Sequence, residues 1–449
     1  MNRNDTTTKN VSGEFLEFSG ERYYLIGNVD KMAPFFISVI SNVDHWLFVS
    51  STGGLTAGRV SPETALFPYV TVDKIHENVT HTGSKTMLRI TTGEGISYWE
   101  PFDREQDGHY TLTRNLYKST LGNKLCFEEI NHDLQLVFRY TWATSDTYGF
   151  VRQCELQNLG DQNLDIDLVD GLQNILPAGT PRSAQTNTSN LVDAYKWTEL
   201  DESTRLALFT LYSGISDRAE PCESLRANTV FCLGLDDAAV LISSEQLNNF
   251  RVGTELRQEV HRRGVRGAYL VSTTLDLAAN TSRTWQIVAD IELDQAQVVD
   301  LLEQLRKPSQ VEEAIAQSVA RGSDDLARIM ARADSSQLTA EENVSAHHYA
   351  NVLFNVLRGG IFDNQYIIPC RDLARTIKHF NQNVYQANLD LFDQLPETLK
   401  LPDLLERVKQ TNDAQLERLC QEYLPIRFGR RHGDPSRPWN QFAIELKDS

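Results

Sequence analysis

The stretch Leu134-Gln-Leu-Val-Phe-Arg-Tyr-Thr-Trp142 decides the fold class of this sequence. Apolar and polar side chains partly alternate along it, which is typical of a β-strand with one buried face. Short runs rich in β-branched and aromatic residues recur on both sides of it, and Gly, Asn, Asp and Pro separate them. The clearest runs are Tyr23–Ile26, Phe35–Ile40, Trp46–Val49, Phe150–Leu156, Leu164–Val169, Leu206–Tyr212, Ala239–Ser243, Gly267–Leu275 and Thr284–Ile291. No segment with helical periodicity lies between these runs, and they are more numerous than the strands of a simple sandwich. The pattern therefore predicts a large antiparallel double sheet.

The hydrophobic period changes towards 3.6 residues after Asp294. One amphipathic face is marked by Val298, Leu301, Leu302 and Leu305, and Pro308 interrupts it. Further helices are predicted over Val311–Ala333, His347–Leu357, Cys370–Phe392 and Leu401–Tyr423. A C-cap is expected at Gly359-Gly360, and Pro425 is expected to end the helical region. The sequence therefore predicts a β-rich part followed by a helical part.

The composition excludes several classes of partner. The chain has 449 residues, 41% of them apolar, and a net charge of −18 from 61 acidic and 43 basic residues. The negative electrostatic potential of such a chain repels nucleic acid and anionic membrane surfaces. No apolar run is long enough to span a membrane, and Met1 to Asn10 has no signal-peptide core. The six cysteines are scattered without a C-x-x-C pair, which favours reduced thiols, a cytoplasmic location and no metal site.

Four stretches, taken in order, resemble the N-terminal part of large bacterial proteins related to cellobiose phosphorylase and its glycoside hydrolase relatives. They are Gly54-Leu-Thr-Ala-Gly-Arg-Val-Ser-Pro-Glu-Thr-Ala-Leu-Phe-Pro-Tyr69, then Tyr98-Trp-Glu-Pro-Phe102, then Gln157-Asn-Leu-Gly160 through Asp170-Gly-Leu-Gln-Asn-Ile-Leu-Pro177, and finally Tyr349-Ala-Asn-Val-Leu-Phe-Asn-Val-Leu-Arg-Gly-Gly360 with Arg430-Arg-His-Gly-Asp-Pro-Ser-Arg-Pro-Trp-Asn440.

The resemblance implies a β-supersandwich over residues 13–293, preceded by a disordered N-terminus at 1–12. A helical linker would cover 294–424, and 425–449 would begin an (α/α)6 catalytic barrel that is otherwise missing from the chain. In relatives the barrel holds the catalytic carboxylate. We therefore expect the front part of an enzyme, inactive alone, with a possible homodimer formed through the sandwich.

The terminal loop is the strongest candidate for a substrate site. Its arginines offer donor forks for phosphate or sugar hydroxyls, its tryptophan a face for a pyranose, and its other polar residues hydrogen bonds. The candidates are Arg430, Arg431, His432, Asp434, Arg437, Trp439 and Asn440. The alternative interpretation is a structural Arg–Asp network that locks the linker onto the barrel.

Trp99 and Glu100, on a turn after a strand, form the second candidate. Trp99 is expected either to shape a sugar subsite or to plug the core, with Glu100 paired to an arginine. The glycine-rich stretch Gly53-Gly-Leu-Thr-Ala-Gly-Arg59 lacks the ending of a phosphate-binding P-loop and predicts a tight turn between strands. The adjacent His347 and His348 do not share a helix face and make a poor metal pair.

The expected chemistry is cleavage of a β-linked oligosaccharide by phosphorolysis or hydrolysis. Inorganic phosphate is a possible co-substrate and no other cofactor is expected. The resemblance slightly favours phosphorolysis, and the catalytic acid cannot be assigned from the residues. One alternative is a non-catalytic carbohydrate-binding or scaffold protein. Another is a sandwich enzyme of the epimerase type, which needs a histidine–carboxylate pair in one concave sheet; the candidates are His45, His81, His109 and His132.

Overall fold

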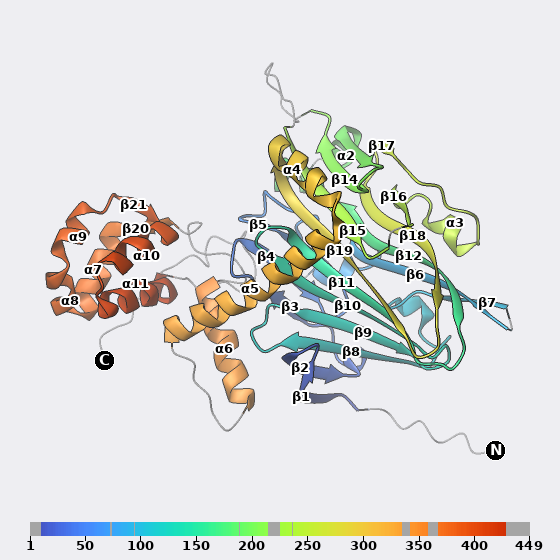
Figure 1. Ribbon diagram of the computed structural model, residues 1–449, viewed down its shortest axis with the longest axis horizontal. Coiled ribbons are helices and arrows are strands. Elements are labelled where there is room, and N and C mark those ends of the chain that lie inside the picture. The colour runs from blue at the N-terminus through green and yellow to red at the C-terminus, as the bar shows by residue number, and fades with distance from the viewer. Residues whose placement is uncertain are drawn as a thin grey trace.

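The computed structural model describes residues 10–427 except 72–73, 94, 188, 214–224, 236, 335–341 and 358–366. A large antiparallel double sheet fills the first part and helices follow it, as the sequence predicts (Figure 1). The larger sheet has eleven strands in the order β1-β2-β8-β9-β10-β11-β19-β15-β14-β13-β17. Their bounds are β1 Ser12–Phe18, β2 Glu21–Gly27, β8 Leu112–Ser119, β9 Leu125–Asn131, β10 Leu136–Ser145, β11 Gly149–Asn158, β13 Lys196–Asp201, β14 Leu206–Leu211, β15 Arg226–Leu233, β17 His261–Arg263 and β19 Ser282–Asp294.

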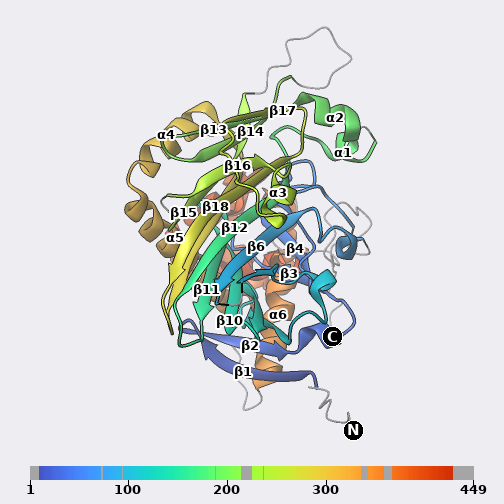
Figure 2. The ribbon, with the colours of Figure 1, turned by 90° about the vertical axis from the view of Figure 1, so that its right-hand side faces the viewer.

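A five-stranded sheet, in the order β16-β18-β12-β6-β7, packs against the larger one. Its strands are β6 Gly83–Thr92, β7 Gly95–Trp99, β12 Leu164–Ile175, β16 Ala239–Ser243 and β18 Gly267–Leu277. A three-stranded sheet consists of β3 Phe36–Val39, β4 His45–Ser50 and β5 Leu55–Arg59. Short helices connect some of these strands: α1 Arg182–Asn187, α2 Ser189–Tyr195 and α3 Leu247–Arg251. Figure 2 shows α1 and α2 at one end of the sandwich.

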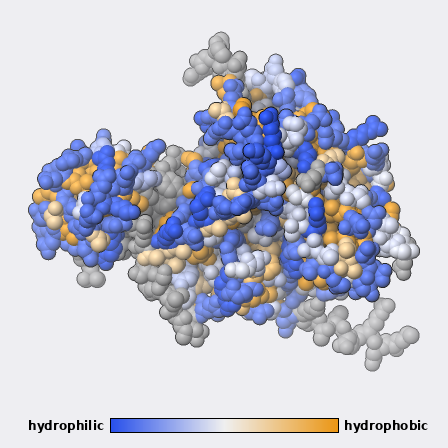
Figure 3. Space-filling model, in the orientation of Figure 1, coloured by the Kyte–Doolittle hydropathy of each residue, from blue (hydrophilic) through white to orange (hydrophobic). Residues whose placement is uncertain are grey.

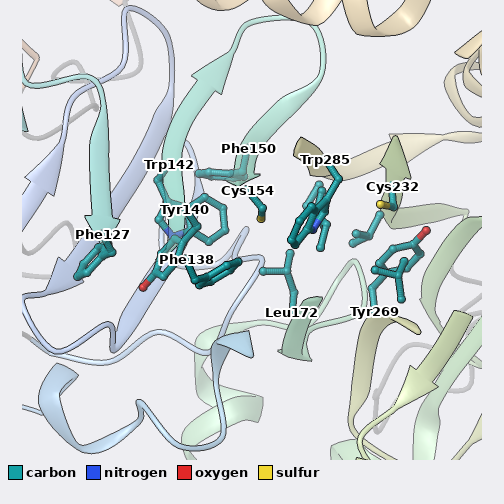
Figure 4. Close-up of a cluster of buried hydrophobic side chains, with 14 of the residues drawn as sticks. Phe127, Phe138, Tyr140, Trp142, Phe150, Cys154, Leu172, Cys232, Tyr269 and Trp285 are labelled. Atoms are coloured by element: carbon teal, nitrogen blue, oxygen red, sulfur yellow. The ribbon is translucent and has the colours of Figure 1, made fainter. Parts of the chain in front are cut away.

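Alternation along β10 explains how the core forms. Phe138, Tyr140 and Trp142 face the interior, whereas Arg139 and Thr141 face the opposite side of the large sheet. Side chains from the five-stranded sheet meet them, so apolar surface is removed from water on both inner faces. Figure 4 shows this cluster of aromatic and sulfur-containing side chains.

Two helices cover part of the outer face of the large sheet. α4 (Gln295–Leu305) starts at Asp294, whose side chain accepts a hydrogen bond from the backbone N–H of Gln297 in a capping box. α5 (Pro308–Asp334) follows directly, and Pro308, which was expected to interrupt the helical run, stands at its first position. Leu301 and Ile315 of these helices join a cluster with side chains of the large sheet, which anchors both helices.

The last described part is a small helical unit that lies to one side of the sheets in Figure 1. It follows α6 (Glu342–Leu357), which starts five residues before the predicted His347. The unit comprises β20 Ile367–Pro369, α7 Cys370–Phe380, α8 Gln382–Ala387, α9 Leu389–Gln394, β21 Thr398–Lys400, α10 Leu401–Gln410 and α11 Ala414–Arg427. Its core includes Leu373, Leu404 and Leu416.

Each of the two long helices predicted for this unit is broken in the structure. The first ends at Phe380, because the Asn381 side chain accepts from the backbone N–H of Val384 and starts a new helix. The second breaks where Asp413 accepts from the backbone N–H groups of Gln415 and Leu416. α11 also continues past Pro425 to Arg427, because a proline near a helix end removes only one hydrogen bond.

The surface in Figure 3 is mostly hydrophilic, with scattered apolar patches. None of the helices in the described ranges has the length and apolar character needed to cross a membrane. The cysteines that the structure describes are all buried: Cys126, Cys154, Cys232, Cys370 and Cys420.

Candidate functional site

The terminal loop that sequence reasoning favoured lies outside the described residues, which end at 427. The roles suggested for Arg430, Arg431, His432, Asp434, Arg437, Trp439 and Asn440 therefore stay predictions. The expected C-cap at Gly359-Gly360 also lies outside them. Of the glycine-rich stretch Gly53–Arg59, only Gly53 and Gly54 lie in the turn between β4 and β5, where Gly53 has a positive φ of 95°, whereas Leu55–Arg59 form β5 itself.

Trp99, at the end of β7, is fully buried in the core between the sheets. Its indole Nε1 donates to the Glu129 Oε1 at 2.8 Å. Glu129 also accepts from Arg114 Nε at 2.6 Å and from the backbone N–H of Phe102 at 2.9 Å. Burial raises the pKa of Glu129, and the Arg114 guanidinium opposes that effect. In this arrangement Trp99 has no exposed face on which a sugar could stack.

Glu100 has only 3% of its surface exposed, and the groups around it compensate its charge. Tyr98 Oη donates to the Glu100 Oε2 at 2.6 Å, and Arg251 Nη2 approaches the same oxygen at 3.4 Å. The Lys85 amine pairs with the other oxygen. Burial lowers the pKa of Lys85 to about 8, and the positive charge of Arg251 adds to this shift. These contacts connect β6, β7 and α3, and they agree with the structural alternative, in which Glu100 pairs with an arginine. Substrate contact by Glu100 stays a prediction.

The histidines needed for an epimerase-type site are not paired with carboxylates within the described ranges. His45 is fully buried, and its Nδ1 lies 3.2 Å from Ser41 Oγ. Burial, reinforced by Arg59, lowers its pKa well below the usual value, so His45 is neutral. His81 contacts Thr80 and His132 contacts Thr113. The described residues also contain no group of three or more histidine, cysteine or carboxylate side chains that could hold a metal ion.

A cavity of about 640 Å³ lies at the edge of the sandwich, where the inner face of β1, β2 and β8 meets β3 and the helix α6. None of its residues was among the candidate site residues predicted from the sequence. Phe15, Tyr24 and Lys118 are paired across β1, β2 and β8, so their side chains form one row on the same face of the sheet. The signal in the sequence was the alternation Arg114, Leu116, Lys118, which places a lysine at an inward position.

Lys118 is the main polar feature of this cavity. Its side chain is half-buried, and within the described ranges it makes no ion pair or hydrogen bond. Burial alone lowers the pKa of its amine to about 8. The aliphatic stem passes over Gly122, where a Cβ would lie 3.4 Å from Lys118 Cε. The amine therefore stands at the wall of an accessible cavity, and no carboxylate among the described residues compensates its charge.

An ion pair holds α6 beside this cavity. Arg22 Nε and Nη2 donate to the two carboxylate oxygens of Glu342 at 2.6 and 2.8 Å, a bidentate pair between β2 and the first turn of α6. Asn343, Ala346 and Ala350 of α6 line the cavity on that side.

Residues 362–425, which include most of the small helical unit, match the sequence model of glycoside hydrolase family 149 insertion domain 1. No curated protein matches the chain. The match identifies a domain type of a glycoside hydrolase family and supports a carbohydrate-active protein of the glycoside hydrolase or phosphorylase kind.

Solved structures with a low similarity include a bacterial glucoamylase complexed with acarbose, at 8% identity and a TM-score of 0.32 over 82% of this chain and 52% of that one. A putative kojibiose phosphorylase from human microbiome has 9% identity and a TM-score of 0.25 over 78% of this chain and 34% of that one. A putative aldose 1-epimerase from Klebsiella pneumoniae has 9% identity and a TM-score of 0.32 over 66% of this chain and 87% of that one. The chain thus spans about half of the glucoamylase and a third of the phosphorylase.

Proposed function

We propose that the chain is the front part of a carbohydrate-active enzyme that cleaves β-linked oligosaccharides by phosphorolysis or hydrolysis. The observation that carries this proposal is the match of residues 362–425 to an insertion domain of a glycoside hydrolase family. The order of a large antiparallel double sheet followed by helices also supports it, because the sequence resemblance implies a β-sandwich followed by a helical part.

Glu100, Glu129 and Asp170 are buried carboxylates whose hydrogen bonds and ion pairs stabilise the fold. This affects which residues can supply the catalytic acid. A glycoside-cleaving acid must be free to protonate the leaving oxygen. Glu100 and Glu129 instead accept from neighbouring cations and from Tyr98 or Trp99, and Asp170 accepts from Arg152. We infer that the catalytic acid lies outside the described residues, and that the sandwich supports the site and mediates a homodimer in the cytoplasm.

Phosphorolysis needs an anion site that positions inorganic phosphate as the nucleophile, whereas hydrolysis needs a base that activates water. Arg430, Arg431 and Arg437 of the terminal loop are the proposed phosphate ligands. His432 and Asp434 would supply hydrogen bonds, with Trp439 and Asn440 contacting the sugar. A small preference for phosphorolysis comes from the sequence resemblance alone.

The test compares the 449-residue chain with the same chain joined to the sequence encoded downstream of it. Phosphate uptake or release, for phosphorolysis, and the appearance of free monosaccharide without phosphate uptake, for hydrolysis, are followed across a panel of β-linked disaccharides. We expect turnover with the joined chain and none with the 449-residue chain. Turnover by the 449-residue chain would contradict the inferred position of the catalytic acid. Oligosaccharide binding without turnover by either protein would favour the alternative, a non-catalytic carbohydrate-binding or scaffold protein.

A further inference from the structure

We propose that the cavity beneath α6 binds a phosphorylated sugar, with the phosphate paired to Lys118 and the sugar ring packed against Phe15 and Tyr24. The inference is independent of the proposed enzymatic activity, because it concerns a cavity formed by the sandwich and α6. The cavity of about 640 Å³ has the size of a small-molecule site.

The charges around the cavity favour an anion. The charges of Arg22 and Glu342, beside the cavity, compensate each other in a bidentate pair. The amine of Lys118 has no such partner within the described ranges. Among the described residues, no carboxylate side chain lines the cavity. A phosphate within contact distance would restore the favourable interaction that burial removes from this amine.

The remaining lining suits a sugar ring better than a purely apolar anion. Phe15 and Tyr24 meet edge to face with their ring centres 4.9 Å apart, which offers aromatic surface for the C–H groups of a pyranose. Ser38, Thr120 and Asn343 also line the cavity, and their side chains make no hydrogen bond with any residue that the structure describes. These groups can donate to and accept from sugar hydroxyls.

Calorimetry with the 449-residue chain tests the proposal, with glucose 6-phosphate, α-glucose 1-phosphate, glucose, inorganic phosphate and octanoate as probes. We expect a sugar phosphate to bind at least about tenfold more tightly than glucose or phosphate, because one charge-assisted contact is added to the ring contacts. Lys118→Met should weaken that binding by about tenfold. Lys307→Met, the same change at an exposed lysine after α4, should leave it unchanged.

Three results would overturn the proposal: equal affinity in the Lys118→Met variant, no binding of either sugar phosphate, or tighter binding of octanoate. Loss of binding in Arg430→Ala and Arg431→Ala variants, with Lys118→Met unaffected, would place the anion in the terminal loop instead.

Should Lys118→Met not fold, the wild-type chain is labelled with an amine-reactive reagent at pH 8 and the labelled lysines are identified by mass spectrometry. Sugar phosphate should then protect Lys118 and not Lys307, and equal labelling of Lys118 with and without the ligand would contradict the proposal.

Discussion

Arg152 and Asp170 form an ion pair in which neither side chain has any exposed surface, and the pair links β11 of the large sheet to β12 of the five-stranded sheet. Arg152 Nη1 and Nη2 donate to the two Asp170 oxygens at 2.7 and 3.0 Å, and Trp285 Nε1 donates to Asp170 at 2.7 Å. Burial by itself lowers the pKa of Arg152, but the Asp170 carboxylate outweighs it, so the pKa is raised and the guanidinium stays charged.

Removing one partner of this pair should destabilise the fold strongly. In Asp170→Asn the Arg152 charge is left buried without its counter-charge, so we expect the free energy of unfolding to fall by about 3–5 kcal/mol. Urea denaturation measures it. Asp165→Asn, an exposed change on the same strand, should stay within about 0.5 kcal/mol of wild type. Equal losses in the two variants would show that the pair does not carry this stability.

Trp99→Phe separates the two interpretations of Trp99. If Trp99 is a core residue that donates to Glu129, the change should lower the free energy of unfolding of the protein by about 1–3 kcal/mol, because the buried carboxylate loses a hydrogen-bond donor. Trp197→Phe is the matched control, since the Trp197 indole N–H has no acceptor within the described ranges. Denaturation and oligosaccharide binding are measured for both. Weakened binding with unchanged stability in Trp99→Phe would support a sugar subsite instead.

Lys118 should make the stability of the chain depend on pH above neutrality. Burial lowers the pKa of this amine to about 8, below its ordinary value of 10.5. Between these values the unfolded chain binds more protons than the folded chain, so the contribution of Lys118 to the free energy of unfolding rises with pH across that window. Below pH 8 both states carry the charge and its burial destabilises the fold.

Lys118→Met should therefore be at least as stable as wild type at pH 7, and its advantage should shrink as the pH rises from 8 towards 10.5. Chemical denaturation at both ends of this window measures the difference. An advantage that does not change with pH would mean that the Lys118 amine is not desolvated in the folded chain.

The pair between Arg22 and Glu342 should hold α6 in place. Both side chains are partly exposed, the side chain of Arg22 by 38% and that of Glu342 by 43%, so salt screens the attraction. Glu342→Gln should speed amide hydrogen exchange in α6, and high salt should reduce the difference from wild type. Glu17→Gln removes only the contact at 3.9 Å to Arg22 and should leave exchange in α6 unchanged. Identical exchange in both variants would show that α6 is held by its packing alone.

The sequence by itself determined the fold class and the order of its parts. Period-2 runs become strands and period-3.6 runs become helices, because both periods follow from local backbone geometry. The caps that break the predicted long helices, at Asn381 and Asp413, are also local features, but the apolar pattern continues on both sides of each and predicts one unbroken helix.

Only the tertiary structure decided which polar groups meet. Arg22 and Glu342 are 320 positions apart, and Lys118 lies beside Tyr24 because β2 and β8 are neighbours in one particular register. Such contacts depend on strand order and on how α6 returns to the sheet, and neither is encoded in the period of a single segment. The identity of the partners of Trp99 and Glu100, adjacent at the end of β7, was likewise decided by the strands and the helix packed around them.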